Sequence, residues 1–462
     1  MEIVLVYPNL TRLERVTLGL GYVASYAQNN GHTCSFVDYT WGGDVEKTVN
    51  KVRETGAKIV GLSVKSGEVE FCKEISRRVK AEFGATVVWG GVHPSIDSEA
   101  TIAMDCVDII CVGEGEEATT ELLNSMEKGE LDTTIPNLWI KKDGLIHRNQ
   151  IRDLQQSLDE IPFPDRDLHD TQLYIERSGT VDLIAGRGCP YQCSYCVEPT
   201  YQEVFKGKGQ FVRFRSPESL MDEISDLQKR FKFTNINFVD DVFTIDIRWL
   251  RKFAPLYKKY FKIPYTCNAR IEAMREESFQ LLKDSGCSSL EMGIESGSEP
   301  LRRKVLERKM TNERIIEAFD LAHKYGLKTM SFNMVGIPYE TKRDIKQTIK
   351  LNRRLKPSSI QVSMFQPYPG TGLYDICEKN NWLNGKAIPF SYFMDTAVTY
   401  PHLSTDEIIK IRRWFRFDVL RKIDPIKSLV VLFYDLNYER FFKLWSFIPN
   451  QIKKMALAFF KS

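Results

Sequence analysis

Short apolar runs alternate with amphipathic stretches over residues 1–125, and this alternation restricts the possible folds more than any other feature of the chain. A strand buried on both faces is a continuous apolar run, and an amphipathic helix carries the chain to the next strand. The pattern predicts five strands, at Ile3–Tyr7, Thr33–Val37, Ile59–Val64, Thr86–Trp89 and Ile109–Val112. Helices are predicted at 19–29, 45–54, 68–83 and 116–127. The expected fold is α/β, with a doubly wound, Rossmann-like parallel sheet.

Two glycine-rich loops follow the fourth and fifth predicted strands. Their sequences are Gly90-Gly-Val-His-Pro94 and Gly113-Glu-Gly-Glu116. Doubly wound folds bind ligands outside the carboxyl ends of their strands, and glycine lets a backbone approach a ligand closely. The loops therefore predict a ligand site. Plainer interpretations stay open, in which His93 satisfies backbone groups and Glu114 and Glu116 cap the next helix.

A second series of strands and helices begins after a Pro- and Asp-containing stretch near 161–167. Its strands are predicted at Val181–Ala185, Asn235–Val239, Tyr265–Asn268, Ser289–Gly293, Thr329–Val335 and Ile360–Phe365. Six strands separated by helices predict a partial (β/α)6 barrel. Ser404 and Glu407 form a capping box that begins a helical C-terminal module. The predicted boundaries are 1–140 for the first domain, 141–174 for a linker, 175–375 for the barrel and 376–462 for the module.

Cys189, Cys193 and Cys196 form a C-x3-C-x2-C cluster directly after the first predicted barrel strand. Three thiolates can bind three irons of a 4Fe-4S cluster and leave the fourth iron without a protein ligand. Structural zinc would need a fourth Cys or His. No such residue follows within twenty positions, and His169 lies twenty residues upstream. The cluster therefore predicts an iron–sulfur site with one open iron.

This spacing resembles the radical S-adenosylmethionine (SAM) superfamily. The resemblance implies that SAM binds the open iron through its amino and carboxylate groups. It further implies that one electron cleaves the sulfonium and yields a 5′-deoxyadenosyl radical, which takes hydrogen from a substrate. Tyr195, immediately before the last cysteine, matches the aromatic residue that the family places against the adenine.

Polar residues at the ends of the later barrel strands complete the expected SAM site. The candidates are Asp240, Asp241, Arg270, Glu295, Ser296 and Asn333. The paired aspartates could accept hydrogen bonds from the SAM ammonium, and Arg270 could pair with a carboxylate. A solvated strand end is the plainer interpretation of the aspartates. Cys267, beside Arg270, is expected to be a small buried residue instead of a ligand.

The order of the two regions looks like that of the cobalamin-binding radical SAM family, and the match covers roughly residues 1–375. It implies a cobalamin held by the first domain. The residues assigned to it are Ser63, Gly90, Gly91, His93, Gly113, Glu114 and Gly115. The D-x-H-x-x-G motif that supplies a cobalt ligand elsewhere is absent after the first strand, where the chain reads Pro8-Asn-Leu-Thr-Arg-Leu. In this family the lower face of cobalt is generally left without a protein histidine.

The resemblance leads to three functional hypotheses. The first is a cobalamin-dependent methyltransferase that acts on an unactivated carbon or phosphorus centre. The second is a radical cyclase or rearranging enzyme without methyl transfer, and the third is a non-catalytic cofactor carrier. An uncoordinated iron argues against the carrier. The expected partners are a small-molecule substrate, hydrophobic or lipid-like, and an electron donor such as flavodoxin or ferredoxin.

Composition limits the compartment and the partners. The ten cysteines do not form a disulfide pattern, and the short apolar start with Glu2 does not resemble a signal peptide, so the cytoplasm is expected. The net charge of +3 gives no reason to expect nucleic acid. Residues 404–462 carry 12 basic and 6 acidic side chains among many aromatics. These helices either contact an anionic membrane, cover the barrel as a lid or, least expected, bind nucleic acid.

Overall fold

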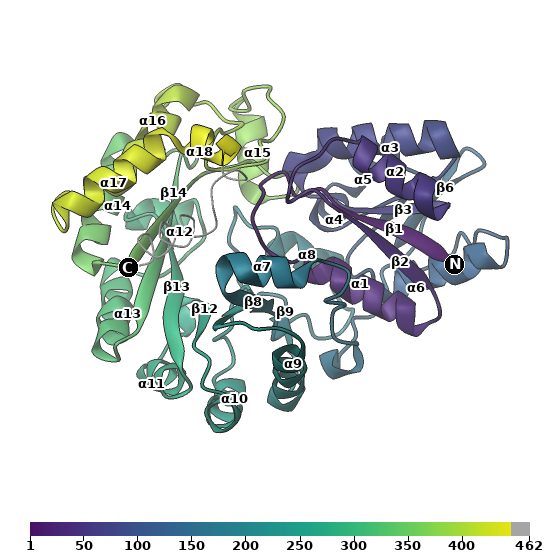
Figure 1. Cartoon of the computed structure of the whole chain (residues 1–462). Coiled ribbons are helices and arrows are strands. Elements are labelled where there is room, and N and C mark those ends of the chain that lie inside the picture. The colour runs from purple at the N-terminus through teal and green to yellow at the C-terminus, as the bar shows by residue number, and fades with distance from the viewer. Residues whose placement is uncertain (445–462) are drawn as a thin grey trace. The chain divides into compact units, whose positions relative to one another are not determined.

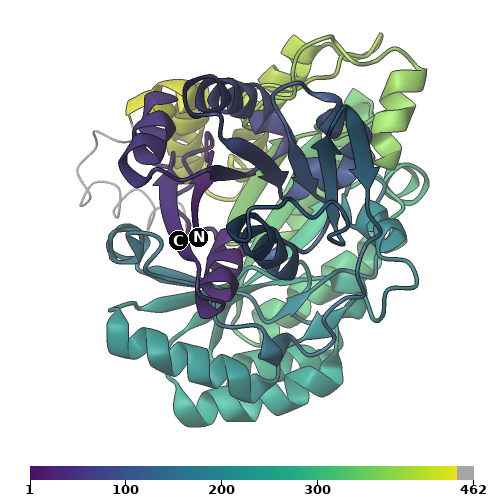
Figure 2. The same ribbon diagram turned by 90° about the vertical axis from the view of Figure 1, so that its right-hand side faces the viewer.

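The computed structural model describes residues 1–444 and divides the chain into two compact units. The first unit contains residues 1–174 and 197–214, and the second contains 175–196 and the chain from Arg215 onward. The aromatic residues that the sequence analysis noted at 445–460 lie outside the described residues. Both units have a mainly parallel sheet with helices (Figures 1 and 2).

The first unit has a seven-stranded sheet in the order β2-β1-β3-β4-β5-β6-β7. Neighbouring strands among the first five are parallel, whereas β6 and β7 form an antiparallel hairpin at one edge. The strands are β1 (Glu2–Tyr7), β2 (Thr33–Asp38), β3 (Ile59–Ser63), β4 (Thr86–Gly90), β5 (Ile109–Cys111), β6 (Leu138–Lys142) and β7 (Leu145–Arg148). All five strands predicted from the apolar runs are present, so the doubly wound prediction is confirmed.

Helices cover both faces of this sheet, as Figure 1 shows. One core packs α2 (Glu46–Thr55), α3 (Val69–Phe83) and α5 (Ser98–Ala103) on the sheet, and another packs α1 (Leu18–Asn29) and α6 (Glu116–Glu127). The remaining helices are α4 (Val92–Ile96), α7 (Thr171–Ser178), which crosses into the second unit, α8 (Glu198–Val204), and the 3-10 turns η1 (Ser66–Glu68) and η2 (Leu158–Glu160). Burial on both faces explains the unbroken apolar strands.

The second unit has a six-stranded parallel sheet in the order β8-β11-β12-β13-β14-β15. Its strands are β8 (Thr180–Leu183), β11 (Asn235–Phe238), β12 (Tyr265–Ala269), β13 (Cys287–Glu295), β14 (Lys328–Val335) and β15 (Ser359–Met364), and two short strands are β9 (Gly186–Arg187) and β10 (Arg213–Phe214). The strand order follows the sequence and does not close into a ring, which confirms the partial (β/α)6 barrel.

Helices connect these strands and continue past the last one. They are α9 (Pro217–Arg230), α10 (Ile247–Tyr260), η3 (Ile271–Ala273), α11 (Glu276–Asp284), α12 (Glu299–Lys304), α13 (Asn312–Lys324), α14 (Lys342–Leu355), α15 (Gly372–Lys379), α16 (Thr405–Leu420), α17 (Pro425–Leu436) and α18 (Tyr438–Leu444). Helices α9 and α10 lie side by side (Figures 1 and 2). Ser404 and Glu407 form the predicted capping box of α16. Among the described residues no helix is long and apolar enough to cross a membrane.

The first compact unit is larger than the sequence-based boundaries. The predicted linker begins at residue 141, but Lys141 and Lys142 end β6 and pair with β7 (Leu145–Arg148), so the first residues assigned to the linker extend the sheet. Residues 197–214, which directly follow the cysteine cluster, belong to the first unit although the sequence analysis placed them in the barrel. The chain returns to the first unit at residue 197 without a break in the apolar pattern, so the sequence carries no sign of this boundary.

Candidate active site

The loop that carries the three cysteines is held by backbone contacts within the second unit. The Ser194 amide donates to the carbonyl of Leu306 at 3.4 Å, and the Ser194 carbonyl accepts from the amide of Leu373 at 2.9 Å. The Ser194 hydroxyl also donates to the carbonyl of Val305. The Cys196 amide donates to the carbonyl of Cys193 at 2.9 Å, which closes a tight turn between two of the cysteines. These contacts anchor the loop to the residues around Val305, Leu306 and Leu373.

The chemistry of the loop fits an iron–sulfur cluster. None of the three cysteines forms a disulfide, and Cys189 and Cys193 are buried. The described residues contain no group of three or more His, Cys, Asp or Glu side chains placed to hold a single metal ion. In a 4Fe-4S cluster three thiolates bind three different irons, so they need not converge on one ion. Three thiols in one anchored loop are a donor set for a cluster instead of mononuclear zinc.

Arg270, at the carboxyl end of β12, places a positive charge beside the cysteine loop. Its Nη1 donates to Sγ of Cys193 at 2.9 Å, and its Nε and Nη2 bind the Glu272 carboxylate, each at 3.0 Å. The guanidinium also lies 4.0 Å from the centre of the Tyr191 ring. The carboxylate and the ring fix the orientation of the cation, which donates a charge-assisted hydrogen bond toward the sulfur of Cys193.

A buried cluster of charged and polar side chains joins the cysteine loop to the end of β13. Arg308 donates through Nη1 to the Tyr195 hydroxyl at 2.9 Å and to Oε1 of Glu295 at 3.1 Å. Its Nη2 donates to the carbonyl of Gly293 at 2.6 Å. The Tyr195 hydroxyl donates to Oε1 of Glu295 at 3.2 Å. Tyr195 thus reaches this cluster with its hydroxyl, which its predicted contact with adenine did not anticipate.

The protonation of this cluster follows from its burial. Burial raises the pKa of Glu295, and the Arg308 guanidinium acts against that rise. Burial alone would lower the pKa of Arg308, but Tyr195 and Glu295 beside it raise that pKa overall, so the guanidinium stays charged. A buried cation with an adjacent carboxyl group is suited to a zwitterionic ligand, because its carboxylate and ammonium find opposite charges.

The backbone at the end of β13 is unusual. Glu295 has a φ of +62°, which places a side chain other than glycine in the left-handed region, and the register with β14 shifts between Gly293 and Glu295. A Cβ atom at Gly293 would lie 2.4 Å from Oε1 of Glu295 and 3.1 Å from Nη1 of Arg308. Glycine at 293 therefore leaves the space in which the Glu295–Arg308 pair forms.

Three other predicted SAM residues are engaged with the protein itself. Both carboxylate oxygens of buried Asp240 accept from the Ala185 amide, each at 3.0 Å, and burial raises its pKa to about 7. Asn333 is buried in a network in which its Oδ1 accepts from Asn352 at 2.7 Å. The buried Ser296 hydroxyl accepts from the Ser298 amide. These side chains shape the strand ends, and Asp240 is not the solvated residue of the plainer interpretation.

Two predictions near the second sheet remain, for Asp241 and Cys267. Asp241 is exposed next to Asp240, at the strand end where a ligand can reach it. Cys267 is buried, and burial raises the pKa of its thiol, as expected for a small core residue.

In the first unit the predicted cobalamin loop after β5 packs against residues 197–214. Gly113 has a φ of +87°, and a Cβ atom there would lie 2.5 Å from Cζ of Phe205. Arg213, which is buried, pairs with Glu114 through both terminal nitrogens. The Gly113 amide donates to the Ser95 hydroxyl at 2.9 Å. The segment after the cysteines thus fixes the position of this loop, and Glu114 is an ion-pair partner instead of a helix cap.

The loops after β3 and β4 contain the other predicted cobalamin residues. Ser63 ends β3, Gly90 ends β4, and Gly91 precedes α4. His93 is buried, its Nδ1 lies 3.2 Å from the Ser66 hydroxyl, and its Nε2 has no hydrogen-bond partner. Burial lowers the pKa of His93 to about 4, so the imidazole is neutral at physiological pH. A neutral, partly unpaired imidazole at the ligand edge of the sheet fits a polar contact with a cofactor.

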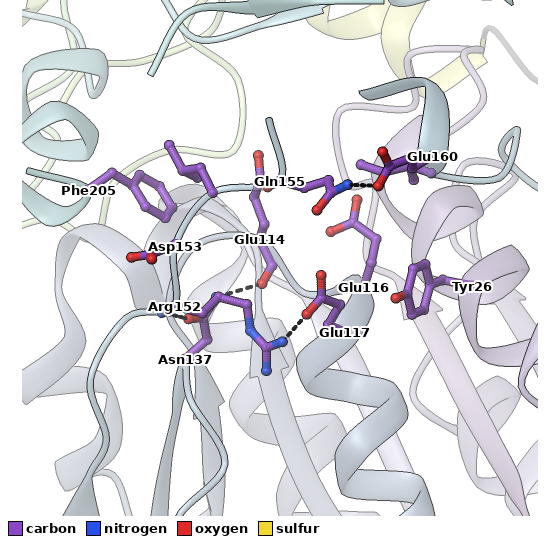
Figure 3. A pocket seen from close by; sticks show the side chains of 12 residues that line it. Tyr26, Glu114, Glu116, Glu117, Asn137, Arg152, Asp153, Gln155, Glu160 and Phe205 are labelled. Atoms are coloured by element: carbon purple, nitrogen blue, oxygen red, sulfur yellow. Dashed lines mark hydrogen bonds and ion pairs between the residues drawn. The ribbon is translucent and has the colours of Figure 1, made fainter. Parts of the chain in front are cut away.

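A pocket of about 160 Å³ is lined by Glu114 and by Glu116 and Glu117 at the start of α6 (Figure 3). Its charged lining residues are Glu114, Glu116, Glu117, Arg152, Asp153 and Glu160. Arg152 points toward Glu117 in Figure 3 and also donates to Glu121 at 2.6 Å. The lining is mostly acidic, so this pocket suits hydrogen-bond donors better than anions.

Several important side chains were not predicted. Arg308 lies in a basic run with Arg302, Arg303 and Lys309 that reads as a solvated helix surface, yet Arg308 and Arg302 are buried. Arg213 and Phe205 were not considered because their stretch was assigned to the barrel. A single sequence carries no signal that separates a buried arginine from an exposed one.

Comparison with known proteins identifies two domains. The model of the radical SAM superfamily matches residues 183–351, and that of the B12 binding domain matches residues 12–123. The first interval contains the cysteine cluster, Arg270, Glu295 and Arg308. The second contains all the residues predicted to bind cobalamin.

Three similar proteins cover most of the chain. A Pyrococcus horikoshii protein named uncharacterized methyltransferase PH0819 is 28% identical over 429 residues, which are 89% of this chain and 91% of the relative. The anaerobic magnesium-protoporphyrin IX monomethyl ester cyclase of Rubrivivax gelatinosus is 24% identical over 376 residues, which are 77% of this chain and 65% of the cyclase. The structure of the radical SAM methyltransferase TsrM from Kitasatospora setae, with cobalamin and a [4Fe-4S] cluster bound, superimposes with a TM-score of 0.67 at 19% identity. It covers 83% of this chain and 78% of that one, and at this identity it shows a shared fold.

Proposed function

Because the chain belongs to the cobalamin-binding radical SAM enzymes, we propose that it transfers a methyl group to an unactivated carbon or phosphorus centre of a small molecule. The observation that carries this proposal is the anchored loop with Cys189, Cys193 and Cys196. Arg270 Nη1 lies 2.9 Å from Sγ of Cys193, and the hydroxyl of Tyr195 in the same loop bonds to Glu295 and Arg308. The methyltransferase name of the Pyrococcus horikoshii relative supports the same reaction.

The cofactors implied are a 4Fe-4S cluster, SAM and cobalamin. When bound, they supply a radical that removes hydrogen from the substrate and a methyl group for transfer. Cys189, Cys193 and Cys196 would hold the cluster. The charge of Arg270 beside Cys193 would offset the negative charge of the thiolates, and Glu272 and Tyr191 keep Arg270 in position.

We assign the SAM amino-acid group to the buried cluster at the end of β13. Arg308 would pair with the carboxylate, and Glu295 and exposed Asp241 would accept from the ammonium. Asp240, Ser296 and Asn333 would support the site indirectly, because their polar atoms already bind protein groups. In the first unit, Ser63, Gly90, Gly91, His93 and Gly113–Gly115 would line the cobalamin site.

A second candidate function is radical cyclisation or rearrangement without methyl transfer. The observation that favours it is the likeness to the Rubrivivax gelatinosus cyclase, whose named substrate is a porphyrin ester. The same relative favours a largely apolar substrate for this chain. The reductant is proposed to be a flavodoxin or ferredoxin, and the compartment the cytoplasm. A non-catalytic carrier is disfavoured by the SAM-binding charges next to the cysteine loop.

The test begins with anaerobic reconstitution of the full chain with iron, sulfide and hydroxocobalamin, followed by iron and cobalt counts. Reduced enzyme is then incubated with SAM and with candidate substrates, and 5′-deoxyadenosine and product mass are measured. A product heavier by one CH2 unit supports the methyltransferase, and an isomer or ring-closed product of unchanged carbon count supports the second candidate. Iron without cobalt retention would sink the cobalamin part of the proposal. Release of no 5′-deoxyadenosine with any substrate would favour the carrier.

A further inference from the structure

Helix α17 buries polar residues and exposes apolar ones, the reverse of an ordinary surface helix. Its buried residues are Ser428, Val431 and Asp435, two of which are polar. Asp435 is held there by Arg416, whose Nε and Nη2 donate to its two oxygens at 2.8 and 2.6 Å. The exposed residues include Ile426, Leu429 and Phe433, with exposed fractions of 78%, 62% and 62%. A helix that turns its polar side to the protein and its apolar side outward is built to meet an apolar partner.

The exposed apolar side chains form one stripe. Residues 426, 429, 430, 433 and 436 follow helical spacing, so they lie along a single face of α17. Among the described residues, fourteen large apolar side chains are exposed, and seven of them fall between Trp414 and Leu436. Helix α17 packs beside α16 with its other face (Figure 1). The apolar surface is therefore concentrated on one short element.

Positive charge is in excess in the described segment that contains this stripe. Residues 404–444 carry 9 basic and 6 acidic side chains. The acidic ones near α17 already have partners, since Asp424 caps the helix by accepting from the Lys427 amide and Glu439 pairs with Arg413. Lys422 and Arg440 are exposed at the two ends of the stripe. An apolar face flanked by cations complements a surface that is apolar beneath an anionic layer.

We propose that α17 docks on the surface of an anionic lipid bilayer, with Ile426, Leu429 and Phe433 entering the boundary between headgroups and acyl chains. The helix has 12 residues and is about 18 Å long, so it lies along the surface and does not cross the bilayer. The basic side chains at its ends bind the headgroups.

Two other occupants of the stripe are alternatives to a bilayer. A second copy of the chain would need many more residues, since stable interfaces contain about 20–30 residues a side. Residues 445–462, with Trp445, Phe459 and Phe460 among three lysines, are a candidate occupant that the test below separates from a bilayer.

The test is co-sedimentation of the full chain with vesicles of phosphatidylcholine alone and of equal parts phosphatidylcholine and phosphatidylglycerol. Binding to the anionic vesicles, weakened by salt, is expected. The variant Leu429→Glu should lower the affinity about tenfold. Its matched control is Leu145→Glu, because Leu145 is 64% exposed on the hairpin of the first unit. A Phe433→Trp reporter should show a blue-shifted emission that brominated lipids quench.

Three kinds of result would contradict membrane docking by α17. No binding to anionic vesicles, or equal losses in the Leu429→Glu and Leu145→Glu variants, overturns the proposal. A stable dimer in solution that Leu429→Glu dissociates assigns the stripe to a second copy. Binding that appears only after removal of residues 445–462 assigns it to the chain's own tail. None of these measurements needs cofactors or turnover, so they stand or fall separately from the methyltransferase proposal.

Discussion

The proposed ligand sites at the carboxyl ends of the two sheets are built from different groups, backbone in the first unit and charged side chains in the second. In the first unit the loops after β4 and β5 offer glycine backbone, and the charged Glu114 there is already paired with Arg213. In the second unit the strand ends offer buried side-chain charges, with Arg270 beside Cys193 and Arg308 beside Glu295. A large, mostly neutral cofactor needs room and backbone contacts, whereas a charged cluster and a zwitterion need fixed opposite charges. The two sites should therefore respond to different substitutions.

The largest expected effect is the loss of the cluster in Cys193→Ala. Two thiolates cannot hold the cluster securely, so iron content and 5′-deoxyadenosine release should fall to background while cobalt binding in the first unit persists. The matched control is Cys72→Ala, which alters a fully buried cysteine of α3. Iron content and 5′-deoxyadenosine release at control levels in Cys193→Ala would contradict the assignment of the cluster to the second unit's cysteine loop.

The next effect concerns the buried cation at the end of β13. Arg308→Ala removes the positive partner of a zwitterion and leaves Glu295 and Tyr195 without it, so SAM affinity should fall about 100-fold. Equilibrium dialysis with labelled SAM measures this in the reconstituted enzyme. Arg303→Ala, at an exposed position of the same stretch, should bind SAM normally. Unchanged SAM affinity in Arg308→Ala would mean that this cluster is only structural.

A smaller effect should arise in the first unit from Gly113→Ala. The added methyl group would lie 2.5 Å from the Phe205 ring, so the loop must shift, and cobalamin affinity should fall about tenfold while iron content is unchanged. Gly129→Ala is the matched control, because Gly129 has a similar φ of +84° with no atom within 4 Å of the added position. Titration with hydroxocobalamin distinguishes them. Equal affinities in the two variants would contradict a backbone-built site.

A last effect, on stability and not on cofactor binding, is a pH dependence in the second unit. Burial raises the pKa of Glu340 to about 8, so its contribution to stability is complete below the pKa of the unfolded chain and is lost as the pH rises through 8. Between about pH 6 and pH 9 the protein should lose about 2–3 kcal/mol more unfolding free energy than Glu340→Gln, whose side chain has no charge to bury. Urea unfolding at both pH values tests this, and parallel losses would show that Glu340 ionises without cost.

The sequence predicted the strands of the first sheet well, because helices cover both of its faces and its central strands are short apolar runs. Ile59–Ser63 is an example, with four of its five residues buried. Lys328–Val335 in the second sheet mixes polar and apolar residues, and its burial partly alternates along the strand. The return of residues 197–214 to the first unit was not predictable, since Phe205 and Arg213 find partners about a hundred residues away in sequence. Local patterns report periodicity and do not report such distant partners.

The cysteine part of the site was predictable from spacing alone, whereas Arg270 and Glu295 were candidates only because they lie at predicted strand ends. Three cysteines within eight positions indicate a metal cluster in any sequence context, so that prediction needed no structure. Asp240 shows the limit of such reasoning, because a carboxylate at a strand end suits a ligand and a pair of backbone amides equally well. Arg308 shows the converse, because its ion pair depends on a fold that brings residues 195, 295 and 308 together.

The anchoring of Ser194 bears on how the cluster site can be rebuilt. Its backbone and hydroxyl bind Val305, Leu306 and Leu373, so ordinary protein contacts hold the segment between Cys193 and Cys196. After loss of the iron, we therefore expect the chain to take up a new cluster from iron, sulfide and reductant without first refolding this loop.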